Sequence, residues 1–284
     1  MTTDLFGLTD RAVVVAGAGG GGVGTAVCRL LDAVGARIVA LDIDAERLAM
    51  TEQIIDTKHG RHVSARCDVR DEGQVIEAVA RAVKVMGPLH GLVHVAGGIQ
   101  SPDQWQPTRA VPLAQVREVF RLNLEGGLLM SQAIAQHLID RGDGGSIVLV
   151  SSLAGVLSAP FSASYGAAKA ALLSLMRTEA VEWGPFGIRV NAIAPGTIRT
   201  PRTMRSGGTA EDAQDERDAI PLGRRGRPEE VAGAALFLMS ELAAFVSGQV
   251  LAVDGASSVK PSYLDPTGLP VFVRDPKMRA RLQS

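Results

Sequence analysis

Short apolar runs rich in β-branched residues alternate along this chain with longer segments whose apolar residues recur at helical spacing. The first pair is the run at residues 12–16 and the segment 24–34, in which Val27, Leu31 and Val34 belong to one stripe. Strands that alternate with crossover helices form a parallel sheet covered on both faces. Because such crossovers are right-handed, the pattern predicts an α/β fold: a doubly wound parallel sheet of Rossmann type, flanked by helices on both faces.

The same patterns give the bounds of the elements and of the domain. We expect strands at residues 12–16, 37–41, 62–67, 89–95, 146–150, 189–194 and 249–253, and helices at 24–34, 45–57, 71–85, 113–140, 162–183 and 229–239. No linker separates them, so residues 1–256 are expected to form a single Rossmann-type domain. Residues 197–227 are polar and rich in Thr, Gly and Arg, which is typical of a substrate-binding lid. Residues 257–284 carry four prolines and little periodicity, and are expected to form a C-terminal extension that runs over a surface.

Composition excludes several classes of protein. The formal net charge is -1 and aromatic residues make up 4%, so no surface for nucleic acid is expected. No apolar run approaches the ~20 residues that cross a bilayer, and no secretory signal precedes Val13. The two cysteines, Cys28 and Cys67, are expected to be reduced, partly buried thiols. We therefore expect a cytoplasmic protein with no membrane partner, no nucleic-acid partner and no metal site.

A glycine-rich segment, Gly17-Ala-Gly-Gly-Gly-Gly-Val-Gly24, lies between the first predicted strand and the first predicted helix. Glycines permit a tight turn and let backbone N–H groups approach a pyrophosphate. The start of the helix adds unpaired N–H groups and the positive end of its dipole. The order of strand, loop and helix predicts a nucleotide site with Gly17, Gly22, Val23 and Gly24 against the cofactor, although a glycine loop can also be purely structural.

An acidic residue ends the second predicted strand, in Ala-Leu-Asp42-Ile43-Asp44. A carboxylate there can accept hydrogen bonds from both ribose hydroxyls of an adenosine and would repel a 2′-phosphate. No arginine directly follows it, so we predict NAD as the cofactor, with Asp42 and Ile43 beside the adenosine. The alternative is that Asp42 is a solvated turn residue or caps the helix from Ala45, for which Asp44 is the better cap candidate. Asp68, at the end of the third strand, is expected either to bond the adenine edge or to cap the helix that begins near Asp71.

Tyr165 and Lys169 stand four residues apart in a predicted helix and therefore project from one face. A fixed ammonium beside a phenol favours the phenolate, so the tyrosine pKa, ordinarily ~10, can fall toward working pH. Such a tyrosine can donate and accept the proton in an alcohol–ketone interconversion. Taken alone, the spacing is more often a packed tyrosine beside a solvated lysine, so the motifs elsewhere in the chain decide its meaning.

From Leu5 to about Ser257 the chain resembles the short-chain dehydrogenase/reductase family in its one-domain form. Several motifs in family order and at compatible spacing are far more specific than any one of them. They are the glycine loop, Asp68-Val69, Ala96-Gly97, Asn123, Ser152, Tyr165 with Lys169, Pro195-Gly196 and the closing Ser247-Gly-Gln-Val-Leu-Ala-Val-Asp-Gly255.

The resemblance implies catalytic roles for four residues. Tyr165 is expected to be the acid or base, and Lys169 to bind the nicotinamide ribose and lower the tyrosine pKa. Ser152 is expected to hydrogen-bond the substrate oxygen. Asn123 is expected at a helix irregularity, where it would hold a water of the proton relay.

The resemblance also implies cofactor contacts near the nicotinamide and the adenine. Pro195 and Gly196 would turn the chain under the nicotinamide, with Ile198 and Thr200 near its carboxamide. Small residues would flank the cofactor after the fourth strand. The implied set adds Asp68, Val69, Ala96 and Gly97 to the residues of the glycine loop.

Two departures from the family pattern stand out. The glycine loop has one extra residue between its first glycine and its closing Gly-Val-Gly, and Ala16 stands where threonine is usual. This leaves open which of residues 19–21 touches phosphate. The family turn Asn-Asn-Ala-Gly reads His-Val-Ala-Gly from His94, which removes the usual bracing of that strand. His94 is expected to be buried or on the adenosine side, and not a base, because Tyr165 already fills that role.

Together these features predict an NAD-dependent oxidoreductase that interconverts a small-molecule secondary alcohol and a ketone. One alternative is a reductase of 3-oxoacyl thioesters, whose anionic carrier would meet the arginines of the lid, although most such reductases use NADP. A second alternative is a non-catalytic NAD-binding sensor or scaffold. The family further implies a homotetramer, or a homodimer, paired through the long helices after the fourth and fifth strands. The lid arginines that an anionic thioester carrier would meet are Arg199, Arg202, Arg205, Arg224, Arg225 and Arg227.

Overall fold

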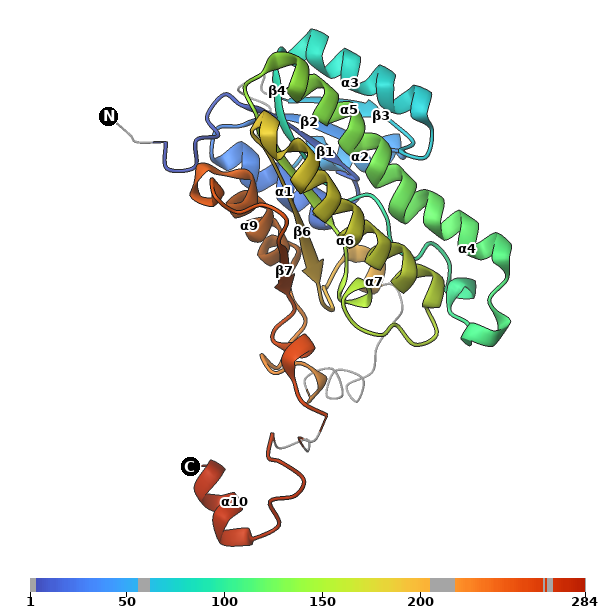
Figure 1. Cartoon of the computed structure of the whole chain (residues 1–284), viewed down its shortest axis with the longest axis vertical. Coiled ribbons are helices and arrows are strands. Elements are labelled where there is room, and N and C mark those ends of the chain that lie inside the picture. Colours follow the sequence, from blue (N-terminus) through green and yellow to red (C-terminus); the bar gives the residue numbers. More distant parts are fainter. Residues whose placement is uncertain (1–3, 56–61, 205–217, 263, 265–267, 284) are drawn as a thin grey trace.

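The computed structural model describes residues 4–55, 62–204, 218–262, 264 and 268–283, and within them seven parallel strands form one sheet (Figure 1). The order is β3-β2-β1-β4-β5-β6-β7, so it reverses between β1 and β4, as a doubly wound sheet requires. The strands are β1 (Ala12–Ala16), β2 (Arg37–Asp42), β3 (His62–Arg66), β4 (Leu89–His94), β5 (Gly145–Val150), β6 (Ile188–Pro195) and β7 (Val250–Val253).

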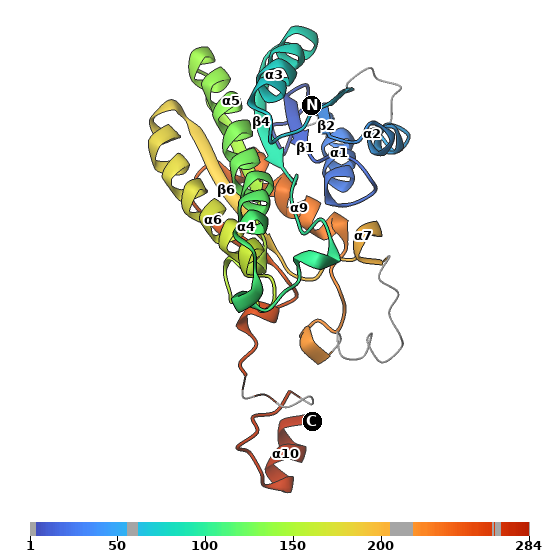
Figure 2. The ribbon, with the colours of Figure 1, turned by 90° about the vertical axis from the view of Figure 1, so that its right-hand side faces the viewer.

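Helices cover both faces of the sheet, which confirms the predicted fold class (Figure 2). Three helices pack against each face, each set with its own cluster of buried side chains. The first set is α1 (Val23–Ala33), α2 (Ala45–Glu52) and α9 (Pro228–Met239); the second is α3 (Glu72–Met86), α5 (Gly126–Arg141) and α6 (Ala163–Trp183). The helix α4 (Leu113–Phe120) packs against α6.

The central strand β1 shows why the apolar run there has no polar member. Side chains along a strand point alternately to its two faces. Val13 and Val15 pack in the cluster under α1 and α9, whereas Val14 packs in the cluster under α3 and α5. All three are fully buried, so every position of β1 has to be apolar.

Acidic side chains fix the starts of two helices. One carboxylate oxygen of Asp44 accepts the N–H groups of Glu46 and Arg47, at 3.0 and 3.1 Å, which confirms Asp44 as the cap of α2. Asp71 caps α3 by accepting the Gln74 N–H at 3.0 Å. The alternative that Asp68 caps this helix is therefore wrong.

Arginines stabilise the amino edge of the sheet. In a crossover unit the helices run against the strands, so their C-terminal carbonyl groups gather at this edge. Arg37 donates to the Met86 carbonyl at the end of α3. Arg189 donates to the carbonyls of Leu238 and Ser240 at the end of α9, at 2.8 and 3.2 Å.

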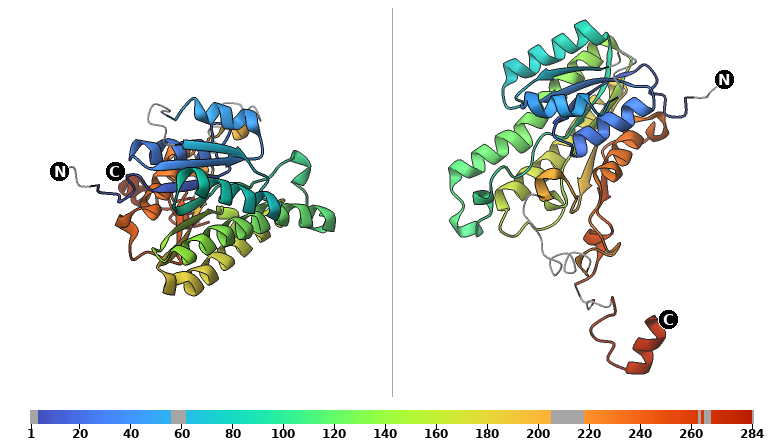
Figure 3. Two further views of the ribbon diagram at one scale, coloured as in Figure 1. Left: turned by 90° about the horizontal axis from the view of Figure 1, so that it is seen from above. Right: turned by 180° about the vertical axis from the view of Figure 1, so that it is seen from behind.

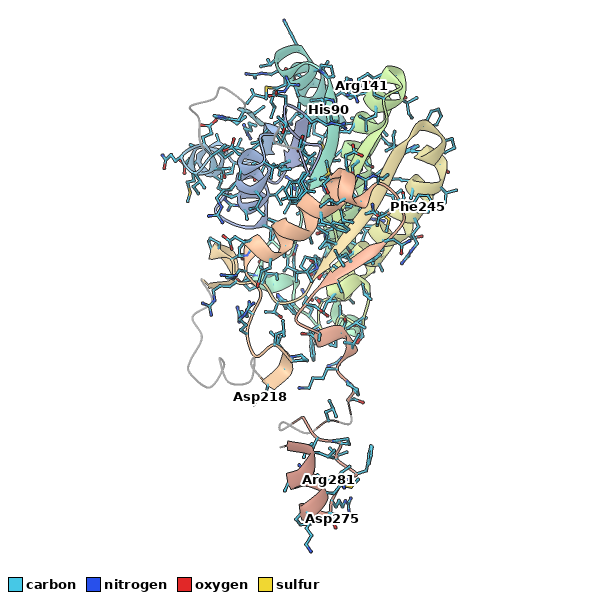
Figure 4. All side chains as sticks on the ribbon, turned by 90° about the vertical axis from the view of Figure 1, so that its left-hand side faces the viewer. His90, Arg141, Asp218, Phe245, Asp275 and Arg281 are labelled. Atoms are coloured by element: carbon cyan, nitrogen blue, oxygen red, sulfur yellow. The ribbon has the colours of Figure 1, made fainter. Side chains whose placement is uncertain are left out.

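His90 lies at the same edge as Arg141 (Figure 4). Its Nδ1 atom accepts the Ala12 N–H at 3.2 Å, at the start of β1. Burial, aided by the charge of Arg141, lowers the pKa of His90 to about 4, so the ring is neutral near pH 7. This edge of the sheet is thus devoted to holding strand and helix ends.

Three predicted segments differ from the structure, while the other predicted elements agree to within one residue at each end. The tract 113–140 is not one α-helix, because a π-helical turn at Arg121–Glu125 separates α4 from α5. The helix predicted at 45–57 ends at Glu52, and residues 56–57 lie outside the described residues. The C-terminal extension contains α10 (Pro276–Gln283), which its weak periodicity did not predict.

The extension and the predicted lid both lie toward the carboxyl edge. In Figures 1 and 3 the extension leaves the end of β7 and projects away from the sheet and its helices. The described parts of the lid segment are 197–204, with α7 (Pro201–Met204), and 218–227. A backbone bridge between Ile198 and Gly226 ties these two parts together. Over the residues that the structure covers, none of the helices has both the length and the apolar character needed to traverse a bilayer.

Candidate active site

The predicted site residues gather at the carboxyl edge of the sheet. The glycine loop follows β1, Gly97 follows β4, Ser152 follows β5, and Pro195 ends β6. In doubly wound sheets this edge, at the point where the strand order reverses, is where ligands bind. Figure 1 shows the arrows of β6 and β7 pointing to it.

The glycine loop leaves no room for side chains at two positions. Gly17 has φ +81°, and a Cβ there would lie 2.5 Å from the Ala96 nitrogen. A Cβ at Gly24 would lie 2.0 Å from the Gly17 oxygen. These contacts bring β1, the start of α1 and the turn after β4 together, which is the close packing that a dinucleotide cradle needs.

The extra residue of the loop is accommodated by hydrogen bonds within the protein. The N–H groups of Gly19, Gly20 and Gly21 donate to the Asp42 carboxylate at 2.9 Å, the Arg47 carbonyl at 3.3 Å and the Thr25 hydroxyl at 3.0 Å. The N–H groups that remain for a pyrophosphate are therefore those of the first turn of α1, from Gly22 and Val23 onward.

Asp42 lies at the end of β2, within reach of this loop. One carboxylate oxygen accepts from Gly19, and the other accepts the Asp44 N–H at 3.1 Å. Each oxygen has a second lone pair free to accept a hydroxyl group. The side chain is therefore fixed in place and still able to bind a ribose. The next residue, Ile43, is exposed.

Asp68 is held by an arginine that the sequence patterns did not single out. Arg70 donates to both Asp68 oxygens, with Nη2 at 2.7 Å from Oδ2, and reaches Glu118 of α4 at 2.8 Å. The hydrogen bond from Arg70 is the main cause that lowers the Asp68 pKa, against the opposing effect of burial. The neighbouring Val69 is buried, and a Cβ at Gly126 would lie 2.7 Å from its side chain. Val69 therefore packs against the start of α5, next to the end of β3.

Lys169 is buried in the middle of the carboxyl edge. Only 2% of the residue is exposed, and Nζ donates to the Val150 carbonyl at 2.9 Å. The Lys169 carbonyl accepts the Ser151 hydroxyl at 3.0 Å, so both ends of the residue are tied to the end of β5. Nζ lies 5.9 Å from the centre of the Tyr165 ring, and Tyr165 is half-buried. The pair predicted from its spacing is thus brought together.

Asn123 lies in the π-helical turn between α4 and α5, and the predicted helix irregularity is confirmed. Its Oδ1 atom accepts the Gly98 N–H at 2.7 Å, and Nδ2 donates to the carbonyls of Gly98 and Val119, both at 3.1 Å. A Cβ at Gly97 would lie 2.8 Å from Oδ1 of Asn123 and 3.0 Å from Nζ of Lys169. Asn123, Gly97 and Lys169 therefore meet at one point.

Ser152 starts a short 3₁₀ turn, Leu153–Gly155, directly after β5. Its Oγ atom accepts the Ala154 N–H at 3.2 Å, which leaves the hydroxyl hydrogen free to donate elsewhere. A Cβ at Gly155 would lie 2.7 Å from the Lys169 backbone, so this turn packs against the helix that carries Tyr165 and Lys169.

The segment after β6 completes the edge. The Gly196 N–H donates to the Val253 carbonyl at 3.0 Å, and a Cβ at Gly196 would lie 2.9 Å from Cβ of Asp254. Ile198 is 8% exposed, and Thr200 caps α7 by accepting the Thr203 N–H at 3.2 Å. The backbone here turns where the resemblance predicts. The side chain of Ile198 is buried, and that of Thr200 caps a helix.

His94 is buried, as expected. It is 1% exposed, and among the described residues no partner reaches its Nδ1 atom. Burial, with the charge of Lys169 as the next cause, lowers its pKa to about 3. The ring is therefore neutral near pH 7. Within the described residues no group of three or more His, Cys, Asp or Glu side chains forms a metal site.

The arginines of the lid segment are partly engaged. Arg224 pairs with Glu230 at 2.6 Å, and this bond is the main cause that lowers the Glu230 pKa to about 2. Arg227 lies 3.8 Å from the same carboxylate. The side chain of Arg202 and all of Arg205 lie outside the described residues.

Sequence reasoning missed two residues of this edge, Arg47 and Arg70. Arg47 follows the capping residue Asp44 by three positions, a spacing at which an ion pair on a helix is expected, and this signal was available. Arg70 pairs with Asp68, two residues away, and with Glu118, whose approach depends on the packing of α4. The sequence alone carries no signal for that second contact.

Comparisons with known proteins cover nearly the whole chain. A family model described as enoyl-(acyl carrier protein) reductase matches residues 17–257. The 2,5-dichloro-2,5-cyclohexadiene-1,4-diol dehydrogenase of Sphingobium indicum is 35% identical over 87% of this chain and 97% of its own length. The cis-4-hydroxycyclohexanecarboxylate dehydrogenase of Sinomonas cyclohexanicum is 39% identical over 87% and 96%. Among solved structures, a gluconate 5-dehydrogenase from Burkholderia cenocepacia in complex with NADP and tartrate matches with a TM-score of 0.82, at 32% identity, over 90% of this chain and 98% of that one.

Proposed function

This chain belongs to the short-chain dehydrogenase/reductase family, and on that premise we propose that it is an NAD-dependent oxidoreductase that interconverts a secondary alcohol and a ketone. The observation that carries the proposal is the position of Lys169. Its ammonium lies 5.9 Å from the centre of the Tyr165 ring, and a Cβ at Gly97 would lie 3.0 Å from it. A fixed cation beside a phenol favours the phenolate, so Tyr165 is suited to exchange a proton with an alcohol oxygen.

The remaining residues divide the work around that proton. Ser152 has a free hydroxyl hydrogen with which to stabilise negative charge on the substrate oxygen. Asn123 braces Gly98 and so keeps the turn after β4 open beside Lys169. When bound, the nicotinamide supplies or accepts the hydride. The cradle fits such a group, because Gly17 and Gly24 let the loop pack closely on its own backbone while a Cβ at Gly22 meets nothing within 4 Å, so the start of α1 is open to a pyrophosphate.

Asp42 supports NAD as the preferred cofactor. Its carboxylate is fixed by Gly19 and keeps lone pairs for ribose hydroxyls, whereas a 2′-phosphate would meet its negative charge. The remaining cofactor contacts that we propose are the first turn of α1, Ile43 and Asp68 with Val69. On the nicotinamide side they are Ala96, Pro195, Gly196, Ile198 and Thr200.

The substrate that we propose is a secondary alcohol on a ring or a polyol chain. The names of the two dehydrogenases given above as relatives describe hydroxyl groups on six-membered rings. The name of the similar solved structure describes gluconate as the substrate. Two aromatic side chains, Trp105 and Phe161, are exposed on neighbouring segments of the chain. These segments are joined by the Gln106 N–H, which donates to the Phe161 carbonyl at 2.7 Å. They offer an apolar rim against which a ring can pack.

The two other functions are less well supported. A reductase of 3-oxoacyl thioesters agrees with the description of the family model. An anionic carrier would have to compete with Glu230 for Arg224 and Arg227. A non-catalytic sensor would have no need of a complete set of Asn123, Ser152, Tyr165 and Lys169.

We further infer how the chain is organised and where it works. Residues 1–256 form one domain with a lid at about 197–227, and 257–284 form an extension. Assembly into a homotetramer is supported by apolar side chains exposed on α6 and near β7, such as Val181, Phe245 and Leu251. Cys28 and Cys67 are free thiols, as expected, and are fully buried, not partly, which suits the reducing cytoplasm.

A panel of substrates with both coenzymes tests the proposal. Ring alcohols, polyols and their ketones, together with a 3-oxoacyl thioester, are offered to the purified protein with NAD(H) and NADP(H), and absorbance of the reduced nicotinamide is followed. Turnover of an alcohol or ketone with NAD(H) supports the proposal. Turnover confined to the thioester favours the acyl reductase, and saturable NADH binding with no turnover on any substrate favours the sensor.

A further inference from the structure

Arg47 is the residue on which the extended glycine loop rests. The Gly20 N–H donates to the Arg47 carbonyl at 3.3 Å. A Cβ at Gly19 would lie 2.7 Å from Cβ of Arg47, and a Cβ at Gly20 would lie 3.3 Å from its Cδ. The stem of the arginine therefore runs along two glycines of the extended loop.

The Asp42 carboxylate and the stem of Arg47 approach the same glycine. The Gly19 N–H donates to Oδ2 of Asp42 at 2.9 Å, and a Cβ at Gly19 would lie 3.0 Å from that oxygen and 2.7 Å from Cβ of Arg47. In this class of fold a carboxylate at the end of β2 receives the ribose hydroxyls of NAD, and an arginine nearby receives the 2′-phosphate of NADP. This chain places one residue of each kind beside the adenosine position.

The arginine is engaged by a second carboxylate. Nε of Arg47 lies 3.1 Å from Oδ2 of Asp44, whose other oxygen caps α2. The side chains of Arg47 and Asp44 are 54% and 38% exposed, so the ion pair is a weak one that solvent and competing anions can exchange. A guanidinium has five N–H donors and binds a phosphate through two of them at once.

We propose that Arg47 helps to determine which coenzyme the protein binds. In the wild-type protein, Asp42 and Asp44 together prevent Arg47 from binding the 2′-phosphate of NADP. Asp42 repels a 2′-phosphate, and Asp44 holds the cation that would neutralise it. Without both carboxylates, Arg47 binds the 2′-phosphate and the site accepts NADP. The inference rests on the proposed function, because it assumes that a nicotinamide coenzyme binds at this edge.

Four variants isolate the contribution of Arg47. Asp42→Asn removes the charge and keeps an oxygen for the Gly19 N–H. Asp44→Ser removes the ion pair and keeps a good helix cap. The double variant carries both changes, and it is then combined either with Arg47→Gln or with the matched control Arg29→Gln. Arg29 is a suitable control because its side chain is likewise half-exposed and forms an ion pair, with Glu229.

The dissociation constants of NADH and NADPH are measured by titrating the fluorescence of the reduced nicotinamide, which needs no substrate. We expect the ratio of the NADPH constant to the NADH constant to fall about tenfold in Asp42→Asn and about tenfold again in the double variant. The second step should vanish with Arg47→Gln and persist with Arg29→Gln. Circular dichroism and thermal unfolding confirm that each variant is folded.

Two results would overturn the inference and leave the proposed function standing. One is a double variant that gains nothing for NADPH over Asp42→Asn, and the other is a gain that survives Arg47→Gln. A wild-type protein that binds neither NADH nor NADPH is a different result, because it removes the proposed function itself.

Discussion

The ammonium of Lys169 and the ring of Tyr165 stand 5.9 Å apart, with the lysine anchored to the Val150 carbonyl at the end of β5. The anchor matters because a lysine on a helix is otherwise among the most mobile of side chains. Here one helical turn sets the spacing between the two residues, and a strand carbonyl sets the direction of the lysine. Tyr165 therefore faces a positive charge whose position does not depend on solvent.

Tyr165→Phe should reduce turnover by about 10²–10⁴-fold or more, because it removes the group that exchanges the proton. The ring and its packing remain, so NADH affinity measured by fluorescence titration should change little. Near-normal turnover in this variant, on the best substrate of the panel, would reject Tyr165 as the acid or base.

Gly97→Ala should weaken coenzyme binding and turnover together. The new methyl group would lie 2.8 Å from Oδ1 of Asn123 and 3.0 Å from Nζ of Lys169, at φ +149°. The matched control is Gly142→Ala, at φ +77° with nothing within 4 Å of its Cβ. The control should cost about 1–2 kcal/mol of stability from backbone strain and leave NADH affinity intact. Equal loss of NADH affinity in both variants would show that strain, and not the site, explains the effect.

Arg189→Met should destabilise the protein by about 1–3 kcal/mol in urea unfolding. It removes the charged donor that the carbonyls of Leu238 and Ser240 share at a partly buried helix end. Leu238 keeps only the Ser146 hydroxyl, at 3.0 Å, and Ser240 only the Ala243 N–H, at 3.1 Å, among the described residues. Arg11→Met is the comparison, since within the described part of the chain the Arg11 side chain makes only an exposed pair, with Glu241 at 3.5 Å. That change should stay within about 0.5 kcal/mol. If the two variants unfold alike, the carbonyl contacts of Arg189 do not contribute to stability.

Glu179→Gln should flatten the dependence of stability on pH. Burial raises the pKa of Glu179 from 4.5 to about 7, against the hydrogen bond from Ser131. Between pH 4.5 and 7 the folded protein therefore binds more protons than the unfolded chain. The contribution of Glu179 to the free energy of unfolding is greatest below pH 4.5 and is lost as the pH rises through 7. Glutamine removes this loss and should add about 2–3 kcal/mol at pH 8 relative to wild type.

The control for that prediction is Glu77→Gln, at an exposed position on α3. Unfolding in urea is followed at pH 5 and pH 8 for both variants. A stability difference between wild type and Glu179→Gln that is the same at both pH values would refute the buried titration.

Much of the fold follows from local chemistry. Apolar runs with β-branched residues gave strands such as β1 and β5 to within one residue, because a strand buried on both faces permits little else. Asp44 could be recognised as a cap since capping involves only the next few residues. The juxtaposition of Tyr165 and Lys169 likewise needs only the helical repeat.

The features that escaped prediction depend on contacts between distant segments. The π-helical turn at Arg121–Glu125 contains no proline or glycine, so the apolar pattern did not predict it and only the family resemblance placed an irregularity at Asn123, which braces Gly98, 25 residues away. Arg70 reaches Glu118 across 48 residues. The helix α10 has no apolar stripe and begins after Asp275, which accepts the Met278 N–H, so only its cap marks it in the sequence.

The arginine-held helix ends and the candidate reactive groups occupy opposite edges of a single sheet, with rigid strands between them. Substitutions at the two edges share no contacts, so their effects on free energy should add. In evolutionary terms, one edge can drift toward new ligands while the other retains the ability to fold. A scaffold divided in this way is well suited to diversify by point mutation.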